Sequence, residues 1–372
     1  MKANVSRPRR HWFIKLMLWM NITVATLMLL AYINTHLSPA TVPYIAFLGL
    51  AYPILLLVHL FFILFWVFIK WKYVFISLLT VLIGSTHLYH FYAVNFSQVV
   101  LKDPLKIMSF NVRIFDLYNR EGRVQNRDEI FDFLDEEAAD ILCFQEFYHQ
   151  EQSVDFVTKD SMIQLLETPY YHERYTHEMT DKRYFGVATF SKYPIFNKGE
   201  IAFENDDNNF CIYSDIATPN ETLRVFNAHL GSIRFQSDDY LFFGDPKVPH
   251  YPKDRTAGQR IVERLKLAFE KRALQAEKVA EEIGKSPYPV VVCGDLNDTP
   301  VSYCYRQFSD LLTDAFVASG NGVGQTYIGK VPSNRIDYIF YDKDFESANF
   351  TTHQVDFSDH KPISCQIGRK KE

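Results

Sequence analysis

The first 94 residues of this 372-residue chain contain no aspartate and no glutamate. They hold only seven of the 39 lysines and arginines, so residues 95–372 carry all 44 acidic residues against 32 basic ones, a formal charge of −12. Tight nonspecific binding of nucleic acid draws on clustered basic side chains that displace counterions. The acidic part of the chain is therefore not built to hold a polyanion through its overall charge.

Cysteine is also scarce, with five residues and no pair at the Cys-x-x-Cys spacing. An odd number without that spacing argues against a disulfide framework and against a thiolate metal site. Cys143, Cys293 and Cys365 lie in apolar runs typical of strands, so we expect buried, unpaired thiols. The chain has no internal repeat and no low-complexity linker.

The acid-free segment consists of three apolar runs, Trp12–Ile33, Pro43–Ile69 and Tyr73–Val94. Each has about the 20 residues that cross a bilayer. Aromatic residues gather near their ends, as expected at a membrane interface: Trp12, Trp66, Trp71 and Tyr73. A cleavable signal peptide is the alternative for the first run, but that run is long for one and two more follow it. We predict a membrane region at residues 1–100 with three transmembrane helices, followed by a second domain at residues 101–372.

Basic residues set the expected orientation of these helices. The cluster Lys2–Arg10 and the hinge Lys70–Lys72 are expected in the cytoplasm, while the uncharged loop Asn34–Val42 crosses the membrane. With three spans, residues 101–372 then lie on the non-cytoplasmic side. We therefore predict a multi-pass protein of the cell membrane.

A few polar side chains fall within the apolar runs: Asn21, His59, His87 and His90. Ionisable groups inside a membrane invite a functional interpretation. Hydrogen bonds between packed helices explain them equally well, and we favour that explanation.

Residues 101–372 alternate between strand-like and helix-like patterns. Short apolar runs and period-two alternation predict strands, and apolar residues spaced among acids predict helices. This mixture indicates an α/β domain. The expected strands are 105–110, 140–146, 185–191, 209–217, 223–230, 290–293, 335–340 and 358–363, and the expected helices are 128–140 and 256–283.

The most informative stretch runs from Pro289 to Pro300. Val290–Cys293 reads as a strand buried on both faces, and Gly294 is expected to turn the chain. Asp295, Asn297 and Asp298 then crowd the end of the strand. An α/β sheet commonly builds a polar site in this way. The alternative is a turn rich in Asp and Asn that only caps the strand.

Further polar residues fall at the ends of other predicted strands or in turns: Asn111, Glu146, His229, Asp337, Asp359 and His360. A single histidine or glutamate at such a place is usually structural or solvated. Seven strand ends or turns that each deliver a carboxylate, an amide or an imidazole indicate a common site.

In chain order the segments are Ser-Phe-Asn with Asn111, Gln-Glu with Glu146, Asn-Ala-His-Leu with His229, Gly-Asp-Leu-Asn with Asp295 and Asn297, Arg-Ile-Asp-Tyr-Ile with Asp337, and Ser-Asp-His with Asp359 and His360. Together they resemble the endonuclease/exonuclease/phosphatase superfamily, from about Leu105 to Ile367. The resemblance implies a four-layered α/β sandwich of two mixed sheets flanked by helices. It also implies phosphoester hydrolysis with Mg²⁺ or Mn²⁺.

The residue types agree with this chemistry. Mg²⁺ prefers oxygen ligands and keeps several waters, so one or two carboxylates seat it. Glu146 is the first choice of ligand, with Asp359 and Asn111 beside it. The ion offsets charge on the phosphoryl oxygens.

The remaining site residues receive roles in the attack of water on phosphorus. His360 is the expected general base, and Asp337 orients it. Asp295 positions the water or shares the metal. Asn297 and His229 are expected to donate hydrogen bonds to the phosphate.

The expected substrate is a phosphoester in nucleic acid, phospholipid or a small molecule, and the expected partner is the lipid bilayer; no protein partner is inferable. A lipid-headgroup hydrolase of sphingomyelinase type and a catalytically silent binding module are the alternatives. Two features are left open. Arg183 and Tyr184 align only approximately with a phosphate contact of the family, and the segment Ser232–Arg260, with its apolar Tyr240–Phe243, either touches lipid or packs on the sandwich.

Overall fold

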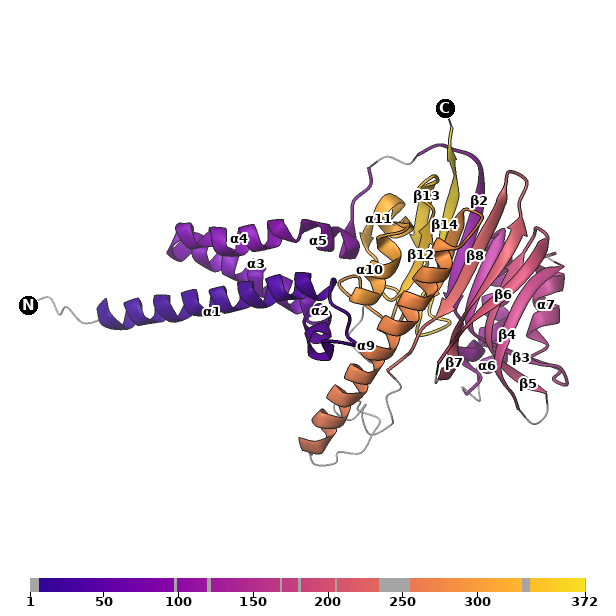
Figure 1. The fold of residues 1–372 in the computed structure, drawn as a ribbon, viewed down its shortest axis with the longest axis horizontal. Coiled ribbons are helices and arrows are strands. Elements are labelled where there is room, and N and C mark those ends of the chain that lie inside the picture. The colour runs from indigo at the N-terminus through magenta and orange to yellow at the C-terminus, as the bar shows by residue number, and fades with distance from the viewer. Residues whose placement is uncertain are drawn as a thin grey trace, which may run out of the picture.

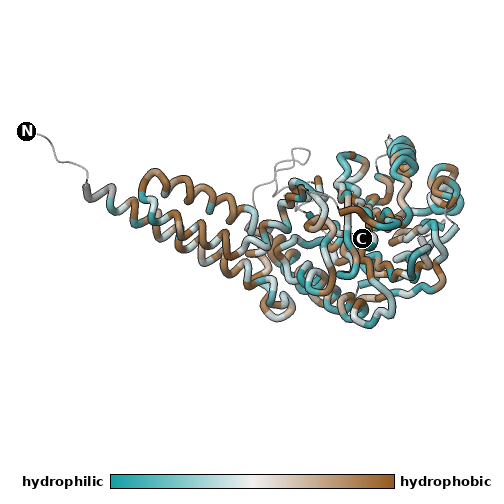
Figure 2. Tube along the Cα trace, turned by 90° about the horizontal axis from the view of Figure 1, so that it is seen from above, coloured by the Kyte–Doolittle hydropathy of each residue, from teal (hydrophilic) through white to brown (hydrophobic). Residues whose placement is uncertain are grey.

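The computed structural model describes residues 7–96, 99–118, 122–167, 169–179, 182–204, 206–233, 255–329 and 335–371. In Figure 1 the N-terminal helices form a rod that meets a body of two β-sheets. Figure 2 shows the rod as mainly hydrophobic along its trace, while hydrophobic and hydrophilic residues are mixed in the body. Tyr240–Phe243, for which a lipid contact was considered, lies outside the described residues.

The rod contains helices α1 (Arg7–Asn34), α2 (Ala46–Leu50), α3 (Tyr52–Ile69), α4 (Val74–Ile83) and α5 (Ser85–Phe91), with 3₁₀ turns η1 (Pro43–Ile45) and η2 (Trp71–Tyr73). Within the described residues, two segments are long and apolar enough to cross a membrane, His11–Asn34 and Tyr52–Ile69. The pair α4 and α5, bent by 65°, counts as a third only if it forms one span.

Proline and glycine explain where these helices depart from the three predicted spans. Pro53 stands in the first turn of α3, where its missing N–H is tolerated, so the second straight span begins at Tyr52 rather than at Pro43. Gly84 separates α4 from α5, and a Cβ atom there would collide with the ring of Tyr32. The third predicted run is thus divided into two helices bent by 65°.

A buried hydrogen-bond network connects the helices of the rod. The Nδ2 atom of Asn21 donates to Ser77 Oγ at 2.7 Å, and Trp66 Nε1 donates to Asn21 Oδ1 at 2.9 Å. His59 Nδ1 lies 2.9 Å from the same Ser77 hydroxyl. These contacts confirm the packing interpretation for Asn21 and His59.

The body contains two six-stranded mixed sheets. In sheet order, the first comprises β13 (Glu346–Thr352), β14 (Ile363–Lys370), β2 (Leu101–Asn111), β3 (Ile141–Gln150), β5 (Arg183–Ser191) and β4 (Tyr170–Met179). The second comprises β10 (Thr313–Asp314), β12 (Asp337–Tyr341), β9 (Val290–Asp295), β8 (Thr222–His229), β7 (Asp206–Ala217) and β6 (Ile195–Phe203). Strands β2 and β3 are parallel, as are β8 and β9.

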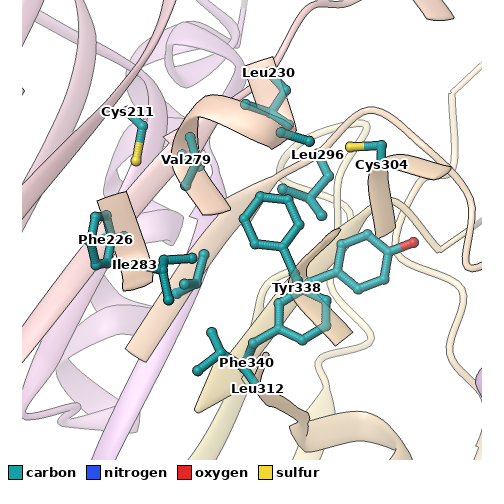
Figure 3. Close-up of a cluster of buried hydrophobic side chains, with 14 of the residues drawn as sticks. Cys211, Phe226, Leu230, Val279, Ile283, Leu296, Cys304, Leu312, Tyr338 and Phe340 are labelled. Atoms are coloured by element: carbon teal, nitrogen blue, oxygen red, sulfur yellow. The ribbon is translucent and has the colours of Figure 1, made fainter. Parts of the chain in front are cut away.

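Helices cover the outer face of each sheet. Helices α6 (Arg123–Glu137) and α7 (Thr158–Leu165) share a buried cluster with the first sheet, and α9 (Arg255–Gly284) and α10 (Tyr303–Ser309) share one with the second. Figure 3 shows part of the second cluster, where Val279 and Ile283 of α9 face Phe226 and Phe340. A third cluster fills the space between the sheets. The predicted four-layered sandwich is confirmed, and all five cysteines are buried and unpaired as expected.

The structure corrects two predicted details. Strand β9 continues through Gly294 to Asp295, and a Cβ atom at Gly294 would collide with the carbonyl of Ala228 on β8. This glycine therefore permits close approach of two strands rather than a turn. Ser358–Ile363 does not form a strand, because only His360 makes an isolated bridge before β14 begins at Ile363.

A short outlying sheet joins the rod to the body. Strand β1 (Tyr92–Ala93), which follows α5, pairs with β11 (Gly322–Val323), which follows the short helix α11 (Ala315–Ser319). The side chain of Asn95 donates to the carbonyl oxygen of Gly320 at 2.6 Å. The chain is thus fastened to the body before it enters β2.

Candidate active site

The polar residues predicted from sequence meet at one edge of the sandwich. Asn111 ends β2 opposite Gln145, His229 and Asp295 end the parallel pair β8/β9, and the hydrogen bond from Asn111 to Asp295 joins these positions at one edge. Strand β3 continues to Gln150, so Glu146 does not stand at a strand end as predicted. Strand β12 runs antiparallel to β9 and begins at this edge with Asp337, opposite Asp295. The loop between β13 and β14 adds Asp359 and His360.

His360 and Asp337 form the tightest pair of the site. His360 Nδ1 lies 3.0 Å from Asp337 Oδ2, and His360 Nε2 lies 3.8 Å from Asp295 Oδ2. Burial alone would lower the pKa of His360, but the carboxylates of Asp337 and Asp295 outweigh it and raise that pKa to about 10. In the part of the chain that the structure describes, Asp295, Asp337 and His360 form the one group of His, Cys, Asp or Glu side chains whose ligand atoms lie close enough together to hold a metal ion.

Asp295 is held from two directions. Its Oδ2 accepts from Asn111 Nδ2 at 3.1 Å, and its Oδ1 accepts from the backbone N–H of Asn297 at 2.8 Å. Burial and the neighbouring Asp337 raise the pKa of Asp295 to about 6, although His360 opposes this. The side-chain amide of Asn297 donates to the carbonyl of Leu230 at 3.0 Å, so one of its two N–H groups is already in use.

His229 presents an unpaired nitrogen to the site. Its Nε2 lies 3.9 Å from both Glu146 Oε1 and Asp295 Oδ2. This nitrogen is buried and has no hydrogen-bond partner among the described residues. Burial lowers the pKa of His229, which favours the neutral ring, although Asp295 opposes the shift. Buried polar atoms in native proteins are normally paired, so this nitrogen is suited to an oxygen from a bound molecule.

Glu146 occupies a strained position within β3. Its backbone has φ +49°, and the pairing of β3 with β5 shifts between Phe144 and Phe147. This bulge turns the side chain toward the strand ends. Burial raises the pKa of Glu146, and Asp359 adds to this, while His360 and Asn111 act against it. The side chain is still 38% exposed, so water moderates the shift.

Glu146 and Asp359 have the chemistry of a magnesium site. Their carboxylates are near enough that Asp359 raises the pKa of Glu146, and a cation would relieve this repulsion. One or two carboxylates with retained waters are sufficient for Mg²⁺. Asn111 Oδ1 already accepts from the backbone N–H of Arg113 at 3.0 Å, and its Nδ2 holds Asp295, so Asn111 fits better as a support.

The group Asp295, Asp337 and His360 offers the other arrangement for a cation. Both carboxylate oxygens of Asp337 lie within 3.1 Å of His360 Nδ1, so this pair already satisfies its own hydrogen bonds. A histidine bonded in this way to a carboxylate is suited to moving a proton. We therefore propose Glu146 and Asp359 as the candidate cation ligands.

Several residues that support the site carry no local sequence pattern by which they could be predicted. Arg113 Nε lies 3.5 Å from Asp359 Oδ2, and Arg113 to Asp116 all have positive φ, an uncommon left-handed turn directly after Asn111. Thr326 Oγ1 accepts from the backbone N–H of Asp337 at 3.1 Å. The ring of Tyr327 stands edge-on to His360, with centroids 5.1 Å apart.

Arg183 and Tyr184 lie farther along the same sheet. Arg183 begins β5 opposite Gln150, four residues beyond Glu146 on β3. The ring of Tyr184 stacks on His149 with centroids 6.1 Å apart, and its hydroxyl donates to Glu151 at 3.2 Å. The described contacts of Tyr184 are thus with neighbouring strands rather than with the strand-end cluster.

Comparison with known proteins agrees with this fold. The model of the endonuclease/exonuclease/phosphatase family matches residues 108–360, and a model described only as a domain of unknown function matches residues 8–91. An endonuclease/exonuclease/phosphatase from Beutenbergia cavernae is 16% identical, with a TM-score of 0.53, 72% of this chain covered and 72% of that one. A protein of the same family from Bacteroides thetaiotaomicron is 16% identical, with a TM-score of 0.51. The match covers 72% of this chain and 98% of that one. No curated protein matches the chain.

The fold is the two-sheet α/β sandwich of the phosphoesterase class. The chain belongs to the endonuclease/exonuclease/phosphatase family, because the family model covers more than half of its residues and the sandwich matches solved members. At 16% identity the structural likeness concerns the fold alone.

The assignment of the cation to Glu146 predicts a loss of metal affinity in Glu146→Gln. The full-length variant in detergent should bind Mn²⁺ at least about tenfold more weakly, because a neutral amide replaces the most exposed carboxylate of the cluster. Binding is measured by electron paramagnetic resonance of free Mn²⁺. Glu151→Gln is the matched control, since Glu151 follows the same strand but pairs with Lys182. Equal affinity in Glu146→Gln and wild type would rule out this ligand.

Proposed function

We propose that this protein is a membrane-anchored, metal-dependent phosphoester hydrolase in which His360 serves as the general base. One observation carries the proposal: His360 is bonded through Nδ1 to Asp337 and directs Nε2 toward Asp295, at the edge where Glu146 also lies. A buried imidazole with one nitrogen fixed by a carboxylate and the other facing a polar cluster has the geometry of a base for water.

The proposed proton path uses only groups at this edge. A water between His360 Nε2 and Asp295 would be oriented by both, and His360 would take its proton as the oxygen attacks phosphorus. Asp337 fixes the ring and stabilises the imidazolium that forms. The carboxylates around His360 hold its pKa near 10, so His360 must first lose a proton to act as a base.

Binding of the phosphoryl group is assigned to His229 and Asn297, and to a cation held by the carboxylates at the other side of the cluster. The unpaired Nε2 of His229 and the second N–H of Asn297 would approach the phosphoryl oxygens. Glu146 and Asp359 would hold Mg²⁺ or Mn²⁺, which when bound neutralises the phosphate and offsets the local negative charge that keeps His360 protonated. Asn111 keeps Asp295 in place.

The substrate class remains a phosphoester of nucleic acid, phospholipid or a small molecule. The formal charge of −12 in residues 95–372 disfavours tight duplex binding, whereas an adjoining apolar rod brings the site near lipid. This proximity favours hydrolysis of a lipid headgroup as the second candidate. A silent binding module is disfavoured, since Glu146, Asp295, Asp337, Asp359 and His360 are all present.

We propose the domain division and topology predicted from the sequence: a membrane region at residues 1–100 and a hydrolase domain at residues 101–372 on the non-cytoplasmic side. The separate family matches at residues 8–91 and 108–360 support the division. The topology requires α4 and α5 to act together as one bent span, because two spans would return the hydrolase domain to the cytoplasm.

Replacement of His360 should abolish hydrolysis. With Mg²⁺ or Mn²⁺, the full-length protein in detergent is expected to hydrolyse bis(p-nitrophenyl) phosphate, and His360→Ala should be about 10² to 10⁴ times slower, the usual contribution of a general base. Release of nitrophenolate measures the rate.

The matched control is His353→Ala. His353 lies in the same connection between β13 and β14 but bonds Ser364, so this variant should stay within about threefold of wild type. Nucleic acid, phospholipid and small phosphoesters are tested alongside. If wild type and His360→Ala are equally inert on every substrate, the chain is a binding module instead.

The proposed topology predicts where the C-terminus lies. Alkaline phosphatase, which folds only outside the cytoplasm, should be active when fused after Glu372, because three spans beginning in the cytoplasm end outside it. A green fluorescent protein fusion at the same position gives the complementary signal. Inactive phosphatase with a fluorescent partner would place residues 101–372 in the cytoplasm.

A further inference from the structure

The rod and the sandwich fit closely beside the active-site edge. Val301, six residues after Asp295, is fully buried against the rod. The side-chain Nδ2 of Asn34, the last residue of α1, donates to the carbonyl oxygen of Val301 at 3.1 Å. A Cβ atom at Gly49 of α2 would collide with that same oxygen. The rod residues that surround Val301 are Met28, Ala31, Tyr32, Tyr52 and Leu55.

A second contact reaches the strand that carries Asp337. Arg335, two residues before Asp337, donates through Nη2 to the backbone carbonyl of His90 in α5 at 2.9 Å. Its guanidinium also pairs with Asp314 at 2.7 Å and lies over the ring of Tyr338 at 4.6 Å. The side chain is only 2% exposed, so each of these partners offsets the burial of its charge.

The two contacts are connected to each other within the sandwich. The hydroxyl of Tyr338 lies 2.8 Å from the carbonyl oxygens of both Asp298 and Arg335. The backbone N–H of Leu296, next to Asp295, donates to the carbonyl of Ile336, next to Asp337, at 2.9 Å. A shift of the rod would therefore move the segments that hold both carboxylates.

The remaining site residues belong to other parts of the sandwich. Asn111 and Glu146 stand on β2 and β3 in the first sheet, and Asp359 follows β13 of that sheet. The rod contacts at Val301 and Arg335 adjoin β9 and β12 of the second sheet. The site thus has two halves. The rod supports the half with Asp295 and Asp337, and the other half carries the proposed cation ligands Glu146 and Asp359.

We infer that the helical rod is part of the catalytic apparatus: through Asn34 and Gly49 at Val301, and through the carbonyl of His90 that holds Arg335, it positions Asp295 and Asp337, so that hydrolysis requires the docked rod. This inference rests on the proposed function. Asn34, Gly49 and Arg335 are positioning residues, because they act through the strands and touch no reacting atom.

The test compares full-length Gly49→Ala with wild type in detergent. The added methyl group should displace the rod from Val301, and kcat on bis(p-nitrophenyl) phosphate should fall at least about tenfold, because small misplacements of reacting groups have large effects on rate. KM and the Mn²⁺ concentration for half-maximal rate should change less than about twofold, since Glu146 and Asp359 lie on the other half. Arg335→Lys, which keeps the charge but not the fork of donors, should show the same pattern.

Hydrogen exchange gives a readout that does not depend on activity. In Gly49→Ala, peptides covering residues 290–302 and 335–341 should exchange faster, while the peptide covering 141–150 should not. The matched control is Ser77→Ala, which removes hydrogen bonds to Asn21 and His59 inside the rod and leaves the docking contacts intact. All four tryptophans lie in residues 1–94, so their emission reports whether the rod is folded.

The outcomes separate the two proposals. If wild type is inert but exchange changes as described, the proposed function fails and the positioning role stands. If Gly49→Ala retains kcat and unchanged exchange at residues 290–302 with normal tryptophan emission, the positioning role is overturned. It is also overturned if kcat, KM and metal dependence all deteriorate together, or if Ser77→Ala has the same effect, because either result indicates general loss of structure.

Discussion

The structure depends on the burial of several like charges at the junction of two sheets. Asp295 and Asp337 face each other across neighbouring strands, and each is almost fully buried. Such a pair is stable only when cations or hydrogen-bond donors compensate it. The ring of His360 lies between them, with Nδ1 bonded to Asp337, and Asn111 Nδ2 and the backbone N–H of Asn297 donate to Asp295. The catalytic geometry and the stability of this edge therefore have the same physical source.

This compensation of charge would allow one site to perform both proposed tasks, moving a proton and holding a cation. The carboxylates in contact with His360 are satisfied by the protein, while Glu146 and Asp359 retain exposure and mutual repulsion. The first group is suited to orienting water and moving a proton, and the second to holding a hydrated cation. The unpaired nitrogen of His229 lies between them, where a phosphoryl oxygen would be held.

The central strands, and the polar residues that the structure brings together at one edge, could be predicted from the sequence because both leave local patterns. The apolar runs Ile141–Phe144 of β3 and Val290–Cys293 of β9 mark these buried strands, and polar residues follow each run. The edge strand β6 was missed, since its polar, partly exposed residues resemble a loop. The left-handed turn at Arg113 to Asp116 and the contact of Asn34 with Val301 had no signal, because tertiary packing alone determines them. The bend between α4 and α5 has a local cause in the sequence, because Gly84 interrupts an apolar run.

We propose that His360, Asp337 and Asp295 move the proton and that Glu146 and Asp359 bind the cation. The position of the bound ion tests this division most directly. A crystal of the full-length protein soaked in Mn²⁺ and measured at the manganese absorption edge would locate it. We expect an anomalous peak coordinated by Glu146 and near Asp359, with the hydrogen bond between His360 and Asp337 intact. A peak enclosed by Asp295, Asp337 and His360, with that hydrogen bond replaced by metal ligation, would contradict it.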